Sequence, residues 1–200
     1  MRKNSIAIWV AWLTLAGCPY LTPSPDPPTT EGTWAAERDR FTRTRKVYNV
    51  LADVAFATAT YQAQSVRVAR VNRLAEWRGT SPGEREALLA KELAEADEFD
   101  DFFLSFYTDD RRANDLDKTP GTWRVTLAWM GREVAPTKIE LLRPDPTVQI
   151  LYPYVDSFRR LYLIRFARPR GSPPLVQFPF ELRIAGAPGR VDMEWSPRAP

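Results

Sequence analysis

Trp123-Arg124-Val125-Thr126-Leu127-Ala128-Trp129 alternates large apolar side chains with small, polar or charged ones, the period of two expected of a half-buried β-strand. Two later stretches, near residues 178–184 and 191–195, repeat this period with charged residues on the opposite face. Their apolar members are Phe178, Phe180, Leu182, Ile184, Val191, Met193 and Trp195, which oppose Glu181, Arg183, Asp192 and Glu194. Alternation of this kind is typical of antiparallel sheets that cover a core with one face.

Further short strands are expected on both sides of this stretch. The expected runs are Asp53–Tyr61, Glu98–Thr108, Ile139 with Leu141, Val148 with Ile150, and Leu161–Ala167, which is apolar on both faces. Twelve of the eighteen prolines lie from Pro120 onward, mostly between these runs, and Pro179 within a run indicates a sheet edge or a bulge. The pattern predicts an α+β, mainly β chain built on an antiparallel two-sheet β-sandwich.

A helical hairpin is expected at about residues 62–97, inserted between two early strands. Gln64–Arg78 has helical spacing, with Val68, Val71, Leu74 and Ala75 on its apolar side. Ser81-Pro82-Gly83-Glu84 has the residues of a helix start with a capping box, and the second helix should bury Leu89, Leu93 and Ala96. The first helix is rich in arginine and the second in acids, so we expect the two to pair as antiparallel neighbours.

Residues 34–49 allow two interpretations. Trp34, Phe41 and Tyr48 recur at the seven-residue spacing of a helix, whereas Phe41–Val47 alternates as a strand does. The sequence leaves this segment open.

The N-terminus has the three parts of a bacterial export signal. Arg2 and Lys3 precede an apolar run over residues 6–13, which is much shorter than the roughly 20 residues of a membrane-spanning helix. Small residues follow, and Leu15-Ala16-Gly17-Cys18 resembles the lipobox of bacterial lipoproteins. The resemblance, which covers only residues 1–18, implies cleavage before Cys18 and attachment of a diacylglycerol to its thiol. An ordinary secretion signal or a retained short anchor are the alternatives.

This resemblance implies a division of the chain and a location. We expect a signal peptide at residues 1–17, the acylated cysteine with a proline-rich tether at 18–33, and one sandwich domain at 34–200. The membrane would then be reached through acylated Cys18. In the family, Asp after the cysteine favours the inner membrane of enteric bacteria, and Pro19 therefore favours the outer membrane.

Composition excludes several classes of chemistry. The chain has no histidine and one cysteine, which removes His-dependent nucleophile systems, His-ligated zinc and intramolecular disulfides. Because Arg2 and Lys3 belong to the signal, 26 of the 28 basic residues remain in the mature chain against 25 acids. That balance does not favour a nucleic-acid partner.

Three groups of residues are candidates for a site. Acids on loops, Asp109, Asp110, Asp115 and Asp117, could form a calcium site, supply a pair for glycoside hydrolysis, or be solvated charges. Tyr152, Tyr154 and Phe158 could form an exposed patch for a sugar or a protein, or be buried at one end of the sandwich. Arg67, Arg70 and Arg73 could contact anionic polymers, but pairing with the acidic helix explains them without a partner.

The expected function is that of a lipid-anchored binding or scaffolding module of the cell envelope. We expect it to need no cofactor and to bind an envelope protein or polysaccharide. We expect no enzymatic activity. A carboxylate-based envelope glycoside hydrolase and a calcium-dependent polysaccharide-binding or adhesion module are the alternatives.

Overall fold

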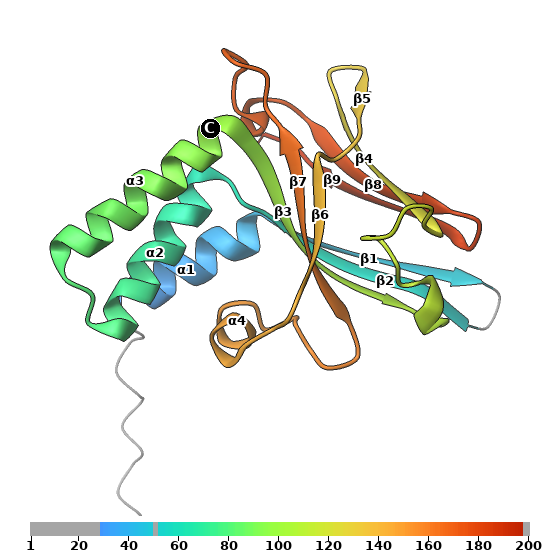
Figure 1. The fold of residues 1–200 in the computed structure, drawn as a ribbon, viewed down its shortest axis with the longest axis horizontal. Helices are drawn as coiled ribbons and strands as arrows, with labels where there is room; N and C mark the ends of the chain where they lie inside the picture. Colours follow the sequence, from blue (N-terminus) through green and yellow to red (C-terminus); the bar gives the residue numbers. More distant parts are fainter. Residues whose placement is uncertain (1–28, 50–51, 198–200) are drawn as a thin grey trace, which may run out of the picture.

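The computed structural model describes residues 29–49 and 52–197, which form two antiparallel β-sheets with helices against one of them (Figure 1). The five-stranded sheet has the order β1-β2-β3-β7-β6, and the four-stranded sheet has the order β5-β4-β8-β9. The strands are β1 Thr42–Asn49, β2 Ala52–Tyr61, β3 Phe99–Thr108, β4 Trp123–Trp129, β5 Arg132–Val134, β6 Lys138–Leu142, β7 Arg160–Ala167, β8 Phe180–Gly186 and β9 Gly189–Trp195. The predicted α+β, mainly β sandwich is confirmed.

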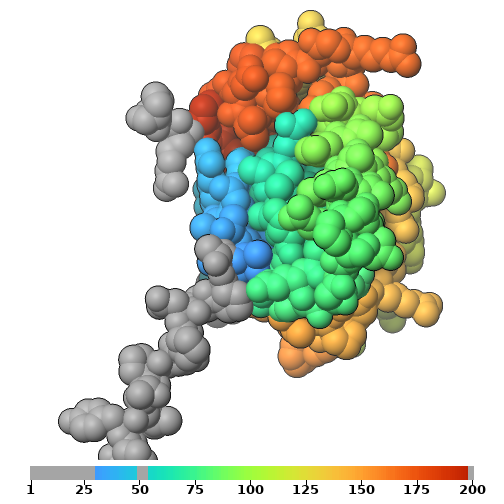
Figure 2. Space-filling model, turned by 90° about the vertical axis from the view of Figure 1, so that its left-hand side faces the viewer, coloured from blue at the N-terminus to red at the C-terminus, as the bar shows by residue number. Residues whose placement is uncertain are grey.

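The helices complete the chain. They are α1 Thr29–Arg40, α2 Gln64–Arg78, α3 Pro82–Glu98 and α4 Pro146–Leu151, with short 3-10 helices η1 Arg111–Ala113 and η2 Leu175–Gln177. Figure 2 shows α1, α2 and α3 side by side on one face of the molecule, in blue, teal and green. No helix in the described part of the chain is both long and apolar enough to cross a membrane.

The core lies between the two sheets, and aromatic side chains dominate it. Phe102 on β3 contacts the rings of Tyr61, Phe166, Phe180 and Trp195, at centroid distances of 5.1–6.1 Å. On β2, Tyr61 pairs with Phe102, and Ala59 and Ala57, which pair with Leu104 and Phe106, continue the core face as small, fully buried side chains. The alternating apolar side chains of β4, β8 and β9 lie in this same core, except that Trp129 is only partly buried against it. Phe178, expected with them, precedes β8 and is half-buried.

The other face of β3 is also buried, because helices and the α4 segment cover it. Asp101 binds Arg67 of α2, and Phe103 stacks on Tyr152 just after α4. β3 and β7 therefore lie in the middle of three layers, which explains why Leu161–Ala167 is apolar on both faces.

The predicted helical hairpin is present between β2 and β3. Ser81 caps α3: its hydroxyl accepts from the Glu84 backbone N–H, and the Glu84 carboxylate accepts from the Ser81 backbone N–H. Gly79 ends α2 in the left-handed conformation, φ 59°, that a residue without a Cβ adopts at little cost.

The buried face of the hairpin differs from the prediction in part. Val71 and Ala75 are buried as expected, but Val68 and Leu74 are only half-buried, and the other buried side chains of α2 are Val66, Arg67, Ala69 and Arg73. The reason is that α2 has neighbours on several sides: α1, α3 and the sheet. In α3 only Ala96 is buried, while Leu89 and Leu93 are half-buried, because this helix has α2 on one side and little on the others.

Residues 34–49, for which the sequence allowed either a helix or a strand, contain parts of both. α1 ends at Arg40, and β1 begins at Thr42. Helix α1 begins at Thr29, within the segment 18–33 that the sequence assigned to the cysteine and its tether. Cys18, Pro19 and the lipobox lie outside the described residues.

The run containing Val148 and Ile150 was expected to be a strand and is helix α4 instead. The Asp145 carboxylate accepts from the Val148 backbone N–H at 2.8 Å, and Pro146 occupies the first helical position. Pro179 lies just before β8 rather than inside it.

Candidate functional site

The structure places the four loop acids apart from one another. Among the described residues no three Asp, Glu, Cys or His side chains are placed to hold an ion. Asp115 is buried and accepts hydrogen bonds from the Thr122 backbone and hydroxyl at 3.0–3.1 Å, whereas Asp109, Asp110 and Asp117 are exposed. The four acids are therefore not gathered into one group: Asp110 caps η1, Asp115 bonds Thr122, and Asp109 and Asp117 lie in solvent.

The three aromatic residues do not form one exposed patch either. Tyr152 is 1% exposed and lies between Phe103, stacked at 4.4 Å, and Trp34, edge-on at 5.4 Å. Tyr154 bonds the Thr60 hydroxyl at 2.7 Å, and burial raises its pKa well above the usual value. Only Phe158, 70% exposed, points to solvent. The rings of Tyr152 and Tyr154, just after α4, therefore pack against the five-stranded sheet.

The arginines of α2 are paired, as the charges of the two helices predict. Arg67 and Arg70 both bind Glu92 of α3, at 3.1 and 2.6 Å. Arg73 pairs instead with Glu31 of α1 and with Glu76. These guanidinium groups hold the three helices together.

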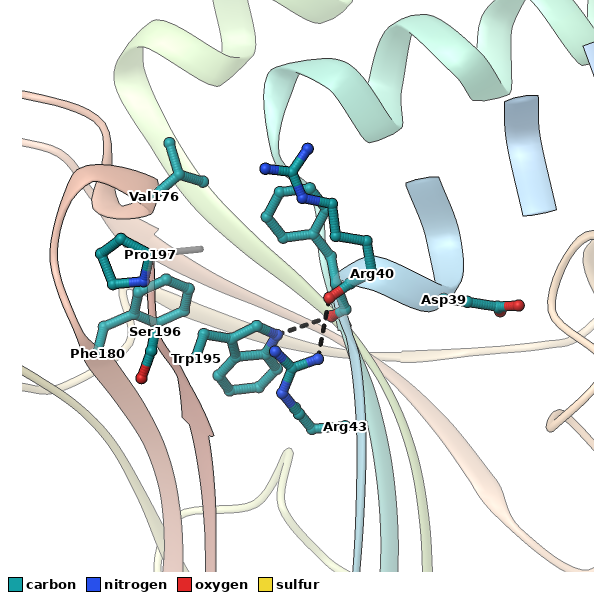
Figure 3. Close-up of a pocket in the computed structure, with 9 residues that line it drawn as sticks. Asp39, Arg40, Arg43, Val176, Phe180, Trp195, Ser196 and Pro197 are labelled. Atoms are coloured by element: carbon teal, nitrogen blue, oxygen red, sulfur yellow. Dashed lines mark hydrogen bonds between the residues drawn. The ribbon is translucent and has the colours of Figure 1, made fainter. Parts of the chain in front are cut away.

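A cavity of about 510 Å³ lies at one end of the sandwich, where β1 begins and β9 ends. We call it the end groove, and Figure 3 shows its lining, which consists of Asp39, Arg40, Phe41, Arg43, Val176, Phe180, Trp195, Ser196 and Pro197. β1 and β9 are edge strands of different sheets. The groove therefore sits where the two sheets meet without a shared backbone ladder among the hydrogen bonds of the described residues.

Two stacked rings form the floor of the end groove. Phe180 and Trp195 lie 5.2 Å apart and nearly parallel, and both are almost fully buried. The Trp195 indole N–H donates to the Phe41 carbonyl oxygen at 2.8 Å, a bond that ties the end of β9 to the start of β1. The floor is rigid and apolar, and little of either ring face is presented outward.

The rim of the end groove is cationic. Arg43 donates to the carbonyl oxygens of Arg40 at 2.9 Å and Glu194 at 2.9 Å, and its guanidinium lies 5.7 Å from the Trp195 ring centroid. Arg40 is half-exposed, lies 3.8 Å from the Glu37 carboxylate outside the lining, and sits 5.2 Å from the Phe41 ring. The one acid of the lining, Asp39, is bound by Arg38 at 2.8 Å. Arg40 and Arg43 therefore give the rim its charge.

A second cavity of about 310 Å³ continues the groove toward the start of α2. The two cavities share Arg40, Phe41, Val176 and Pro197. Behind the second one, the Asp100 carboxylate accepts from the Tyr61 hydroxyl at 2.6 Å and from Arg168. Burial, then the nearby Asp100 charge, raises the pKa of Tyr61 well above its usual value. Asp100 is thus a paired structural carboxylate.

The sequence prediction missed the end groove. Its lining comes from residues 39–43, 176–180 and 195–197, which only the folded sheets bring together. The strand ending at Trp195 followed by Ser196-Pro197 is the one local signal, and it marks a strand end rather than a cavity.

Comparisons with known proteins add no function. No family model and no curated protein matches the chain. One similar solved structure is described as a novel protein of unknown function from Burkholderia pseudomallei K96243, with 11% identity, 84% of each chain covered and a TM-score of 0.46. A likeness at this level carries no argument about the present chain.

Proposed function

We propose that this protein is a lipid-anchored binding module of a bacterial cell envelope, without enzymatic activity, and that the end groove is its binding surface. The observation that carries the proposal is the pairing of an apolar floor, Phe180 and Trp195, with a rim on which Arg40 and Arg43 outweigh one already paired acid. Such a surface fits an extended segment of an envelope protein with an acidic side chain beside an apolar one.

Protein is favoured over polysaccharide by the burial of the two floor rings. Sugar rings bind by stacking on aromatic faces, and Phe180 and Trp195 are too buried to present theirs. Small apolar groups at the mouth, Val176 and Pro197, suit an aliphatic side chain better (Figure 3).

The placement of α1 supports an anchored orientation. Arg73, in the second half of α2, holds Glu31 near the start of α1, whereas Arg40 at the end of α1 lines the groove. Nine helical steps of about 1.5 Å each separate Glu31 from Arg40 by roughly 14 Å. A chain fastened through Cys18 would therefore enter the domain at the end of α1 that lies away from the groove.

The anchor is tested by Cys18→Ser in the full chain. Each buried methylene contributes about 0.8 kcal/mol, and two or more acyl chains hold a protein stably on a membrane. We expect the wild type to sediment with membranes and to incorporate labelled palmitate, and the variant to lose the label and become extractable by salt. Equal sedimentation without label in both proteins would contradict the lipid anchor.

The groove is tested with a photo-crosslinking residue placed at Ser196, which is exposed in the lining, in envelope preparations. A peptide that covers the crosslinked segment of the captured protein should bind the purified full chain. Arg40→Glu should weaken that binding about three- to tenfold, because it places an acid opposite the acidic segment.

Arg124→Glu is the matched control, since Arg124 is an exposed arginine on β4 outside the groove. Equal weakening by both variants, or crosslinks to polysaccharide alone, would count against the proposed partner.

A further inference from the structure

A smaller cavity, of about 170 Å³, lies at the other end of the five-stranded sheet. Its lining is Thr108, Arg111, Asn114, Ser157, Phe158, Arg159 and Arg160. β3 runs from Asp100, beside the extension of the end groove, to Thr108, about 26 Å away at roughly 3.3 Å per residue. The cavity is therefore a separate site, and we call it the arginine pocket.

The lining of the arginine pocket carries three cations and no carboxylate. Arg160 donates to the Asn114 carbonyl oxygen, and no ion pair within the described residues involves Arg160 or Arg111. Arg160 also hydrogen-bonds the Tyr162 side chain, but each guanidinium has five N–H donors, so several of those on Arg160 and Arg111 remain available. Three arginines around one small space repel each other unless an anion lies between them.

Arg159 has a partner that only partly offsets its burial. Its Nε lies 3.1 Å from the Asp156 carboxylate, and its guanidinium stacks 3.9 Å from the Phe56 ring centroid. Burial lowers the pKa of Arg159, and the charge of Asp156 opposes this shift without cancelling it. A second anion near this group would stabilise its charged form.

The acids around the pocket are engaged elsewhere or exposed. Asp110 accepts from the Arg112 backbone N–H at 2.9 Å, and Asp156 accepts from the backbone N–H groups of Phe158 and Arg159 at 2.9 and 3.1 Å. Asp109 is exposed outside the lining.

We propose that the arginine pocket binds a phosphate group, held by Arg111, Arg159 and Arg160. Planar guanidinium forks match the oxygens of phosphate, and such charge-assisted hydrogen bonds are short and strong. The volume is well below the roughly 300–1,000 Å³ of pockets for drug-sized ligands, so it suits one small group. The site does not depend on the end groove or on the anchor.

Phe158 sets what such a ligand can carry. Its ring is 70% exposed at the mouth of the pocket, which leaves an apolar surface beside the bound group. A phosphate ester with an apolar or ring-bearing substituent would contact this surface, and inorganic phosphate would not.

Calorimetric titration of the full-length protein in detergent with inorganic phosphate and with phenyl phosphate tests the site. Arg160→Gln and Arg111→Gln should each weaken binding of both probes about ten- to a hundredfold, the loss of a hydrogen bond to a charged group. Arg111 is the second variant because its side chain is exposed and its replacement spares the Arg160–Asn114 contact. Arg124→Gln, on exposed β4, should leave both affinities unchanged.

The two probes separate a free anion from an esterified one. Phenyl phosphate that binds more tightly than inorganic phosphate, with the difference abolished by Phe158→Ala, supports an ester ligand. Equal affinities support inorganic phosphate. Absence of saturable binding of either probe, or equal weakening by Arg124→Gln, would overturn the proposal.

Discussion

Asp101→Ala is expected to lower the free energy of unfolding by about 3–5 kcal/mol, because it leaves two arginines without their shared partner. The Asp101 side chain is almost fully buried and accepts from Arg67 at 2.7 Å and from Arg165 at 2.8 Å. The hydrogen bonds that Arg165 donates to Asp101 are the main cause of its raised pKa; burial opposes this shift, and Glu95 adds to it. Urea unfolding followed by tryptophan fluorescence measures the change.

Two further variants identify the cause of this loss. Asp97→Ala is the control, since Asp97 is exposed and accepts one hydrogen bond from Gln64; its effect should stay within about 0.5 kcal/mol. Arg67→Met combined with Asp101→Leu should recover part of the loss, because apolar replacement of a buried ion pair removes both desolvation penalties. If the double variant loses as much free energy of unfolding as the two single variants added together, the Arg67–Asp101 pair is not the cause of the loss.

Phe102→Ala should cost about 3–5 kcal/mol through the cavity that it opens between the sheets. Phe102 is fully buried and touches four aromatic rings from β2, β7, β8 and β9. The packed sheets on both sides cannot collapse far into the space, so the upper part of the range is expected. Thermal and urea unfolding should agree on the loss.

Phe158→Ala is the matched control for Phe102→Ala. The same side chain is removed, but Phe158 is mostly in solvent, so stability should change by no more than about 0.5 kcal/mol. Equal losses at both positions would mean that the sheets do not share the core described above.

Local patterns were enough to predict the sandwich and the hairpin. Trp123–Trp129 alternates with little interruption, and Ser81 with Glu84 forms a capping box that depends only on neighbouring residues. Both signals come from interactions within a few residues, and both are confirmed.

Short helices and cavities could not be predicted in the same way. α4 has six residues, too few for helical spacing to stand out from the alternation of Val148 and Ile150, although Asp145-Pro146 is a usable start signal. α1 has a weak apolar stripe and is held mainly by Trp34, whose indole donates to the Leu151 carbonyl oxygen far along the chain. The arginine pocket joins Arg111 to Arg159 and Arg160 across nearly fifty residues, and only the two adjacent arginine pairs hint at it.

The position of Trp195 in the last strand has a consequence for biosynthesis. The stack on Phe180 and the contact with Phe102 cannot form until Trp195 itself has left the ribosome. The contact between Phe102 on β3 and Trp195 on β9 is distant in sequence, and such contacts slow folding and leave a nascent chain open for longer. If the chain is exported through a translocon before it folds, as proposed above, this late closure would help to keep it unfolded until it has crossed.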